Sequence, residues 1–130
     1  MQAKLNKLEI TVYGRIPSKK NSRNIFVRGG KLFNIPSKKY KEWHAAASLH
    51  IIDNRPAEPL DSVDKVELKL YAPDRRAADL TNKAESILDL LVDNGYLTDD
   101  NWFVINKVLL LFMGVDKENP RCEVCIYKDK

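Results

Sequence analysis

Seven carboxylates fall within residues 73–101 of a chain whose formal net charge is +4. They are Asp74, Asp79, Glu85, Asp89, Asp93, Asp99 and Asp100. Carboxylate oxygens are ligands that Mg²⁺ prefers, and the basic side chains around them would attract phosphate groups. The pattern therefore indicates chemistry at a phosphate backbone beside a divalent metal. The plainer interpretation is a solvated acidic face of a helix.

A helix over residues 79–93 is expected to position most of these acids. Asp79 suits the N-cap, and Asn94-Gly95 suits the stop, with Gly95 in a left-handed conformation. Leu90 and Val92 are apolar positions outside the main stripe, so we expect more than half of the helix circumference to be buried. The stripe that faces the sheet is predicted to be Leu80, Ala84, Ile87, Leu88 and Leu91. The polar side is predicted to be Asp79, Asn82, Glu85, Ser86, Asp89 and Asp93.

Two features flank this helix. Arg75 and Arg76 lie just before it, where a helix N-terminus favours phosphate. Asp99 and Asp100 follow it in a short loop. We expect this pair to return to the N-terminal end of the helix, which requires the next strand to begin beside that end.

The order of these motifs resembles the RusA family of Holliday junction resolvases, which occurs in bacteria and their phages. The similar pieces are Pro73-Asp74-Arg75-Arg76, Asp79-Leu80-Thr81-Asn82, Gly95 and Asp99-Asp100. Ile16 to Asn21 is similar to the family's Pro-Ser-x-Asn start, and Tyr40 stands where the family has a tyrosine. The resemblance extends from about Thr11 to Val124.

Two positions depart from the family pattern. Thr81 stands where the family has its second metal-binding aspartate, and Glu85 stands where it has a lysine. Positions four apart are neighbours on a helix, so the Glu85 carboxylate can reach back over Thr81. We therefore hypothesise a moved metal-ligand set of Asp79, Glu85 and Asp100, with Asp99 as a further candidate. Lys83, four residues after Asp79, would restore a positive charge.

The resemblance implies a Mg²⁺-dependent endodeoxyribonuclease, with Mn²⁺ as an alternative metal. It would hydrolyse phosphodiesters in four-way DNA junctions by paired symmetric nicks, as a homodimer and without a nucleotide cofactor. The catalytic residues would be Asp79, Lys83, Glu85 and Asp100. Two alternatives stay open: a junction-binding module whose metal site has decayed, and a structural protein with a basic face and no role on DNA.

A basic segment near the N-terminus favours contact with the DNA backbone. Residues 24–34 predict a hairpin that turns at Gly29-Gly30, and Ser37 predicts the start of a helix whose first turn is lysine-rich. Cations there oppose the helix dipole, which suggests that they serve a phosphate. The candidate DNA contacts are Arg15, Lys19, Lys20, Asn21, Arg23, Lys38, Lys39, Arg75 and Arg76.

The remaining periodicity completes an α/β (α+β) fold within one domain, residues 1–130. The expected elements are strands 8–13, 66–71, 103–113 and 121–127, the hairpin, and helices from Ser37 to about Asn54 and over 79–93. All strands are expected to share one small mixed sheet, on which the two main helices pack. The run 103–113 is apolar enough to predict a central strand.

Several classes of protein are disfavoured. No apolar run approaches ~20 residues and no signal peptide is evident, which predicts a cytoplasmic protein without a membrane span. Cys122 and Cys125 would point to opposite faces of a strand, so we interpret them as reduced structural thiols. His44 and His50 lie six apart on a helix, and we interpret both as packing or surface residues.

Overall fold

The computed structural model describes residues 6–18 and 23–128. Its element order is the one that the sequence predicts, a strand, a hairpin, a helix, a strand, a helix and two strands. The elements are β1 (Asn6–Tyr13), β2 (Arg23–Arg28), β3 (Lys31–Pro36), α1 (Lys38–Ile51), the 3-10 turn η1 (Ile52–Asn54), β4 (Lys65–Ala72), α2 (Leu80–Asp93), β5 (Val108–Val115) and β6 (Arg121–Lys128).

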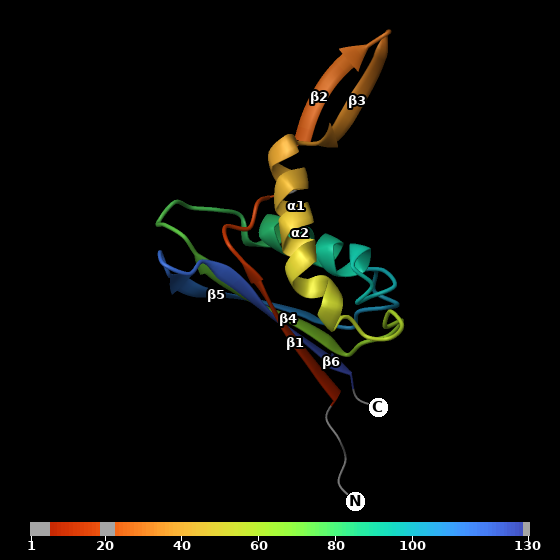
Figure 1. Cartoon of the computed structure of the whole chain (residues 1–130), viewed down its shortest axis with the longest axis vertical. Coiled ribbons are helices and arrows are strands. Elements are labelled where there is room, and N and C mark those ends of the chain that lie inside the picture. Colours follow the sequence, from red (N-terminus) through yellow and green to blue (C-terminus); the bar gives the residue numbers. More distant parts are fainter. Residues whose placement is uncertain (1–5, 19–22, 129–130) are drawn as a thin grey trace, which may run out of the picture.

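The main sheet has four strands in the order β1-β6-β4-β5. β4 and β5 run parallel, whereas the other neighbours are antiparallel, so the predicted mixed sheet is confirmed. The hairpin β2–β3 does not join it. It forms a separate two-stranded sheet that projects from the start of α1, away from the main sheet (Figure 1). The expectation of one common sheet is wrong because these two strands pair only with each other.

Strand β5 differs from the prediction in its bounds and its place. It begins at Val108 and forms an edge of the sheet. Phe112 is 61% exposed and Met113 is 45% exposed. The residues before it bond to the loop ahead of β4, since Val63 N–H donates to the Val104 carbonyl at 2.7 Å. The apolar run 103–113 thus contains two different parts, a loop segment bonded to the residues ahead of β4 and an exposed edge strand. Both parts are apolar, so hydropathy alone does not distinguish them.

The core lies between one face of the sheet and the two helices. Val66 and Leu68 of β4 are paired with Ile126 and Val124 of β6, and all four side chains are buried. Helices α1 and α2 cover this face together (Figure 1). Within α2, Leu90 is also buried, so the expectation that the helix is buried over more than half its circumference is confirmed.

Other local predictions are also confirmed. The Ser37 hydroxyl accepts the Tyr40 N–H and caps α1. Cys122 faces the core beside Leu70, whereas Cys125 lies on the other face of β6. Both cysteines are free and buried, and burial raises the pKa of the Cys122 thiol to about 12. Among the described residues, no helix is long and apolar enough to span a membrane.

Candidate active site at the start of helix α2

Asp79 forms the N-cap of α2, as predicted. Its Oδ1 accepts the backbone N–H of Thr81 at 3.0 Å and that of Asn82 at 3.4 Å. The Thr81 hydroxyl donates to the same oxygen at 2.7 Å. These bonds hold an exposed carboxylate at the positive end of the helix dipole.

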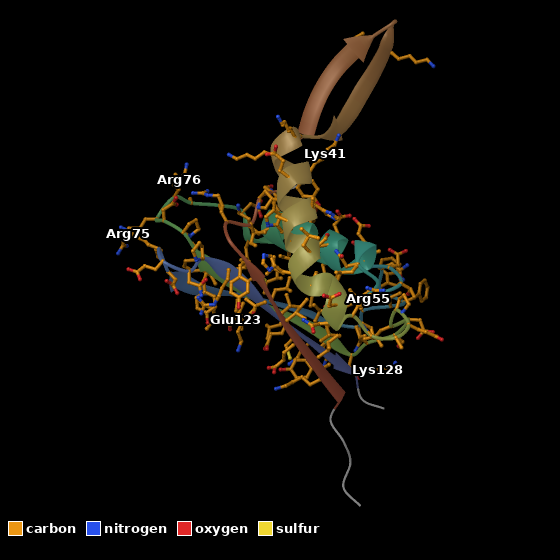
Figure 2. The ribbon with its side chains drawn as sticks, in the orientation of Figure 1. Lys41, Arg55, Arg75, Arg76, Glu123 and Lys128 are labelled. Carbon is orange, nitrogen blue, oxygen red and sulfur yellow. The ribbon has the colours of Figure 1, made fainter. Side chains whose placement is uncertain are left out.

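A cavity of about 650 Å³ opens beside this cap. Its floor includes the apolar side chains of Leu70, Phe112 and Val115, from the neighbouring strands β4 and β5. Arg75 and Arg76 come from the loop between β4 and α2 (Figure 2). Five of the predicted site residues line this one cavity: Arg15, Arg75, Arg76, Asp79 and Lys83.

Two polar side chains of α2, one half-buried and one buried, hold the segment that carries Arg15. Lys83 Nζ donates to the Ile16 carbonyl at 2.5 Å, and Ser86 Oγ donates to the Pro17 carbonyl at 2.6 Å. Ser86 is 0% exposed and Asn82 is 9% exposed. Both side chains lie on the predicted polar side of α2 and are nevertheless buried, and the chain after β1 bonds to this side of the helix.

The charges around the cavity are predominantly positive. Arg15 and Arg76 both form ion pairs with Asp74, and hydrogen bonds from Arg76 lower the pKa of Asp74 to about 2. Burial, followed by the charges of Arg15 and Arg76, lowers the pKa of Lys83. Guanidinium groups, an ammonium group and a helix N-terminus together form a site suited to a phosphate.

Asp99 and Asp100 lie at the opposite end of the sheet from this cavity. β5 runs parallel to β4, so the chain must cross the sheet before β5 begins. Leu97 and Ile105, on either side of the pair, bridge to Leu60 and Val63 ahead of β4. The expectation that Asp99-Asp100 returns to the start of α2 is therefore wrong within one chain, because a parallel crossover places it near the end of α2.

Residues 7–127 match the family described as Endodeoxyribonuclease RusA. The chain is also 30% identical, over 94 residues, to the Crossover junction endodeoxyribonuclease RusA of Aquifex aeolicus (strain VF5). That alignment covers 72% of this chain and 73% of the relative. The chain belongs to the RusA family. It is therefore a nuclease.

The proposed metal ligands Asp79, Glu85, Asp99 and Asp100 all offer carboxylate oxygens, which are ligands that Mg²⁺ prefers. Glu85 is exposed one turn after Thr81, and Asp99 and Asp100 are exposed in their loop. Burial and the Asp99 carboxylate raise the pKa of Asp100, and Asp89 contributes. Asp89 is ten residues beyond Asp79, or about 15 Å along the helix axis. Among the described residues, Asp79 and Asp100 therefore do not converge in one chain.

The predicted DNA contacts fall into two regions of the RusA chain. Lys38 and Lys39 are exposed in the first turn of α1, next to the hairpin. Arg15, Arg75 and Arg76 line the cavity at α2. Lys19, Lys20 and Asn21 lie outside the described residues, as does the side chain of Arg23.

Sequence reasoning did not assign a role to Asp74. In the structure, this carboxylate binds Arg15, which is 59 residues away, and Arg76, which is two residues away. The sequence did indicate a local ion pair for Asp74, because two arginines directly follow it. The long-range partner could be found only from the fold.

Proposed function

We propose that this protein is a Mg²⁺-dependent endonuclease that resolves four-way DNA junctions by paired symmetric nicks. The proposal rests on one observation, which is that the Asp79 carboxylate shares a cavity with Arg15, Arg76 and Lys83 at a helix N-terminus. A carboxylate for a metal and cations for a phosphate are both needed to hydrolyse a phosphodiester. The action on DNA would place the protein in the cytoplasm.

The residues of the cavity would have different roles in hydrolysis of the phosphodiester. Arg15, Arg75 and Arg76 would hold the DNA backbone, and backbone contacts position a protein without reading bases. Lys83 would face the charge that develops on the scissile phosphate. The proposed metal ligands are Asp79, Glu85, Asp99 and Asp100. A bound Mg²⁺ would lower the pKa of a water molecule and offset the phosphate charge.

A homodimer would suit the symmetry of a four-way junction. The surface of β5 supports this proposal, because an edge strand with exposed apolar side chains can pair with or pack on another copy. Trp102 and Phe103, in the loop before β5, are 83% and 81% exposed. Asp79 precedes the first residue of α2, and Asp100 lies in the loop beyond its last residue. A dimer would allow one metal ion to take ligands from two chains.

The alternative is a junction-binding module without cleavage, which the family membership disfavours. Oδ1 of Asp79 already accepts three hydrogen bonds in its role as a cap. Thr81 also lacks the carboxylate expected at its position. A chain that kept its basic surface and lost its metal set would retain junction binding alone.

The test is cleavage of a labelled four-way junction with Mg²⁺ by the wild type, Asp79→Asn, Glu85→Gln and the surface control Asp61→Asn. DNA binding is measured in parallel at several salt concentrations, because phosphate contacts give a steep salt dependence. We expect paired nicks by wild type and Asp61→Asn, and a loss on the order of 100-fold in Asp79→Asn and Glu85→Gln, because each would lose a ligand of the metal that stabilises the transition state.

Each other outcome has a distinct meaning. Full activity of Glu85→Gln would remove Glu85 from the metal set and keep the nuclease. Salt-sensitive binding by a wild type that does not cleave would favour the binding module. Weak, salt-insensitive binding would overturn both candidates. If Asp79→Asn and Asp100→Asn subunits recover nicking only when mixed, the metal set spans two chains.

A further inference from the structure

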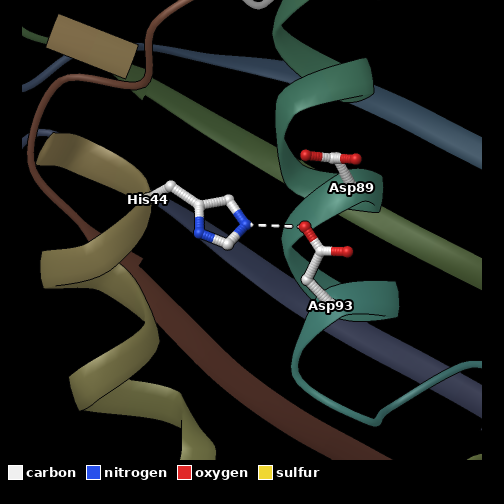
Figure 3. Close-up of side chains that lie close together, drawn as sticks. All are labelled: His44, Asp89 and Asp93. Atoms are coloured by element: carbon white, nitrogen blue, oxygen red, sulfur yellow. Dashed lines mark hydrogen bonds and ion pairs between the residues drawn. The ribbon is translucent and has the colours of Figure 1, made fainter. Parts of the chain in front are cut away.

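A second group of metal-ligating side chains lies between α1 and α2, away from the cavity. It consists of His44 on α1 and of Asp89 and Asp93 on α2 (Figure 3). One ligand atom from each residue lies within 4.8 Å of the other two. His44 Nε2 is 2.9 Å from Asp93 Oδ2. Ligands on adjacent positions of a transition metal are separated by about 3 Å, given metal–ligand distances near 2.1 Å.

The positions of the two aspartates are costly in the absence of a cation. Asp89 and Asp93 are four residues apart on one helix, where like charges repel. Both also lie near the C-terminus of α2, which is the negative end of its dipole. The last turn of α2 contains no basic residue. A metal ion would offset both costs.

The ligands are already oriented by their surroundings. The Tyr40 hydroxyl donates to Asp89 Oδ2 at 2.6 Å, and Tyr40 is only 3% exposed. A hydrogen bond from outside the ligand set fixes the direction of a metal-binding carboxylate. The helical backbone supplies His44 from α1 and both aspartates from one face of α2. Little rearrangement is therefore needed to admit an ion.

We propose that His44, Asp89 and Asp93 bind a divalent transition-metal ion of the Zn²⁺ class, with water completing its coordination. The imidazole sets this preference, because it suits Zn²⁺, whereas Mn²⁺ and Mg²⁺ favour oxygen ligands. The ion would fasten α1 to α2. Since α1 follows directly from the hairpin β2–β3, this clamp would fix the base from which the hairpin projects.

The proposal does not depend on nuclease activity, so it is tested without DNA. Metal-free wild-type protein is titrated calorimetrically with ZnCl₂, MnCl₂ and MgCl₂, and its thermal unfolding is followed with each salt. We expect one site at which Zn²⁺ binds at least tenfold tighter than Mn²⁺ or Mg²⁺. Because an ion that binds only the folded state stabilises it, the midpoint of unfolding should rise with that metal.

Four variants locate the site. His44→Ala and Asp93→Asn should each weaken binding of that ion by about tenfold or more, with circular dichroism confirming that both are folded. His50→Ala is the matched control, because it changes the other histidine of α1, which contacts the Tyr13 ring outside the cluster. Asp79→Asn tests whether the ion is instead held by the nuclease acids.

The proposal is overturned by any of three results. The first is undiminished binding in folded His44→Ala, which would exclude the histidine as a ligand. The second is loss of the ion in Asp79→Asn, which would assign it to the nuclease site. The third is that wild type binds Zn²⁺ no more tightly than Mg²⁺, or not at all, which would leave His44 and Asp93 as a hydrogen-bonded pair without a metal.

Discussion

The two ends of α2 carry opposite chemistry. At its start, Arg15, Arg76 and Lys83 surround the Asp79 cap. Toward its end, Asp89 and Asp93 face His44, and the charge of Asp89 reaches Asp100. The first end has cations beside the positive pole of the helix, and the second has acids near the negative pole.

This difference shows what each end is arranged to receive. Cations at a helix N-terminus repel the dipole and attract an anion such as a phosphate. Acids at a helix C-terminus repel the dipole and attract a cation. At the first end the Asp74 and Asp79 carboxylates offset part of this repulsion, and a bound ligand would offset the remainder at either end. One helix of 14 residues can therefore serve a DNA backbone at one end and a metal ion at the other.

The largest effect is expected when the positive end loses its half-buried cation. Lys83→Met should reduce the rate of junction cleavage on the order of 100-fold, as expected for removal of one group that stabilises transition-state charge. In wild type, the lowered pKa of Lys83 should cause cleavage to decline at a lower pH than for an ordinary lysine, because the ammonium is present only below that pKa. Rates measured across the alkaline range test both statements.

Lys7→Met is the matched control for this change, since Lys7 is exposed at the far end of β1. It should retain the wild-type rate and the alkaline decline. A Lys83→Met variant that cleaves at the wild-type rate would show that the positive end serves only to bind DNA.

A smaller effect is expected from loosening the segment that carries Arg15. Ser86→Ala removes the bond to the Pro17 carbonyl, and a buried acceptor that loses its partner costs about 1–3 kcal/mol. We expect a lower free energy of unfolding by that amount and weaker junction binding. Urea unfolding and binding titrations measure the two quantities. Unchanged stability would mean that the Lys83 and Asp74 contacts are enough to hold this segment.

The smallest effect concerns acid stability. The pKa of Asp74 is lowered from 3.8 to about 2, so its ion pairs contribute stability above about pH 4. That contribution is lost as the pH falls through about 2. Asp74→Asn should flatten the acid limb of the stability curve slightly, because the carboxylate is exposed to solvent. Circular dichroism between pH 5 and pH 2 measures this limb, with Asp61→Asn as the comparison. A steeper limb in Asp74→Asn would contradict the assignment.

Sequence reasoning was most reliable where the signal is local. The Asp79 cap, the Gly29-Gly30 turn and the Gly95 stop were all predicted, and each depends on neighbours within a few residues. It was wrong for β5, where an apolar run was taken for a central strand. Apolar composition shows that a strand can be buried, but it does not show whether the strand has neighbours on both sides or lies at the edge of the sheet.

The sequence by itself determined the order of elements, the capped helix α2 and the family, because capping residues, periodicity and motif order are properties of the chain. Only the tertiary structure decided which of these residues meet. It placed Arg15 beside Asp74 across 59 residues, and it brought His44 to Asp93 across 49. It also separated Asp79 from Asp100, because the parallel pairing of β4 with β5 requires the chain to cross the sheet between them.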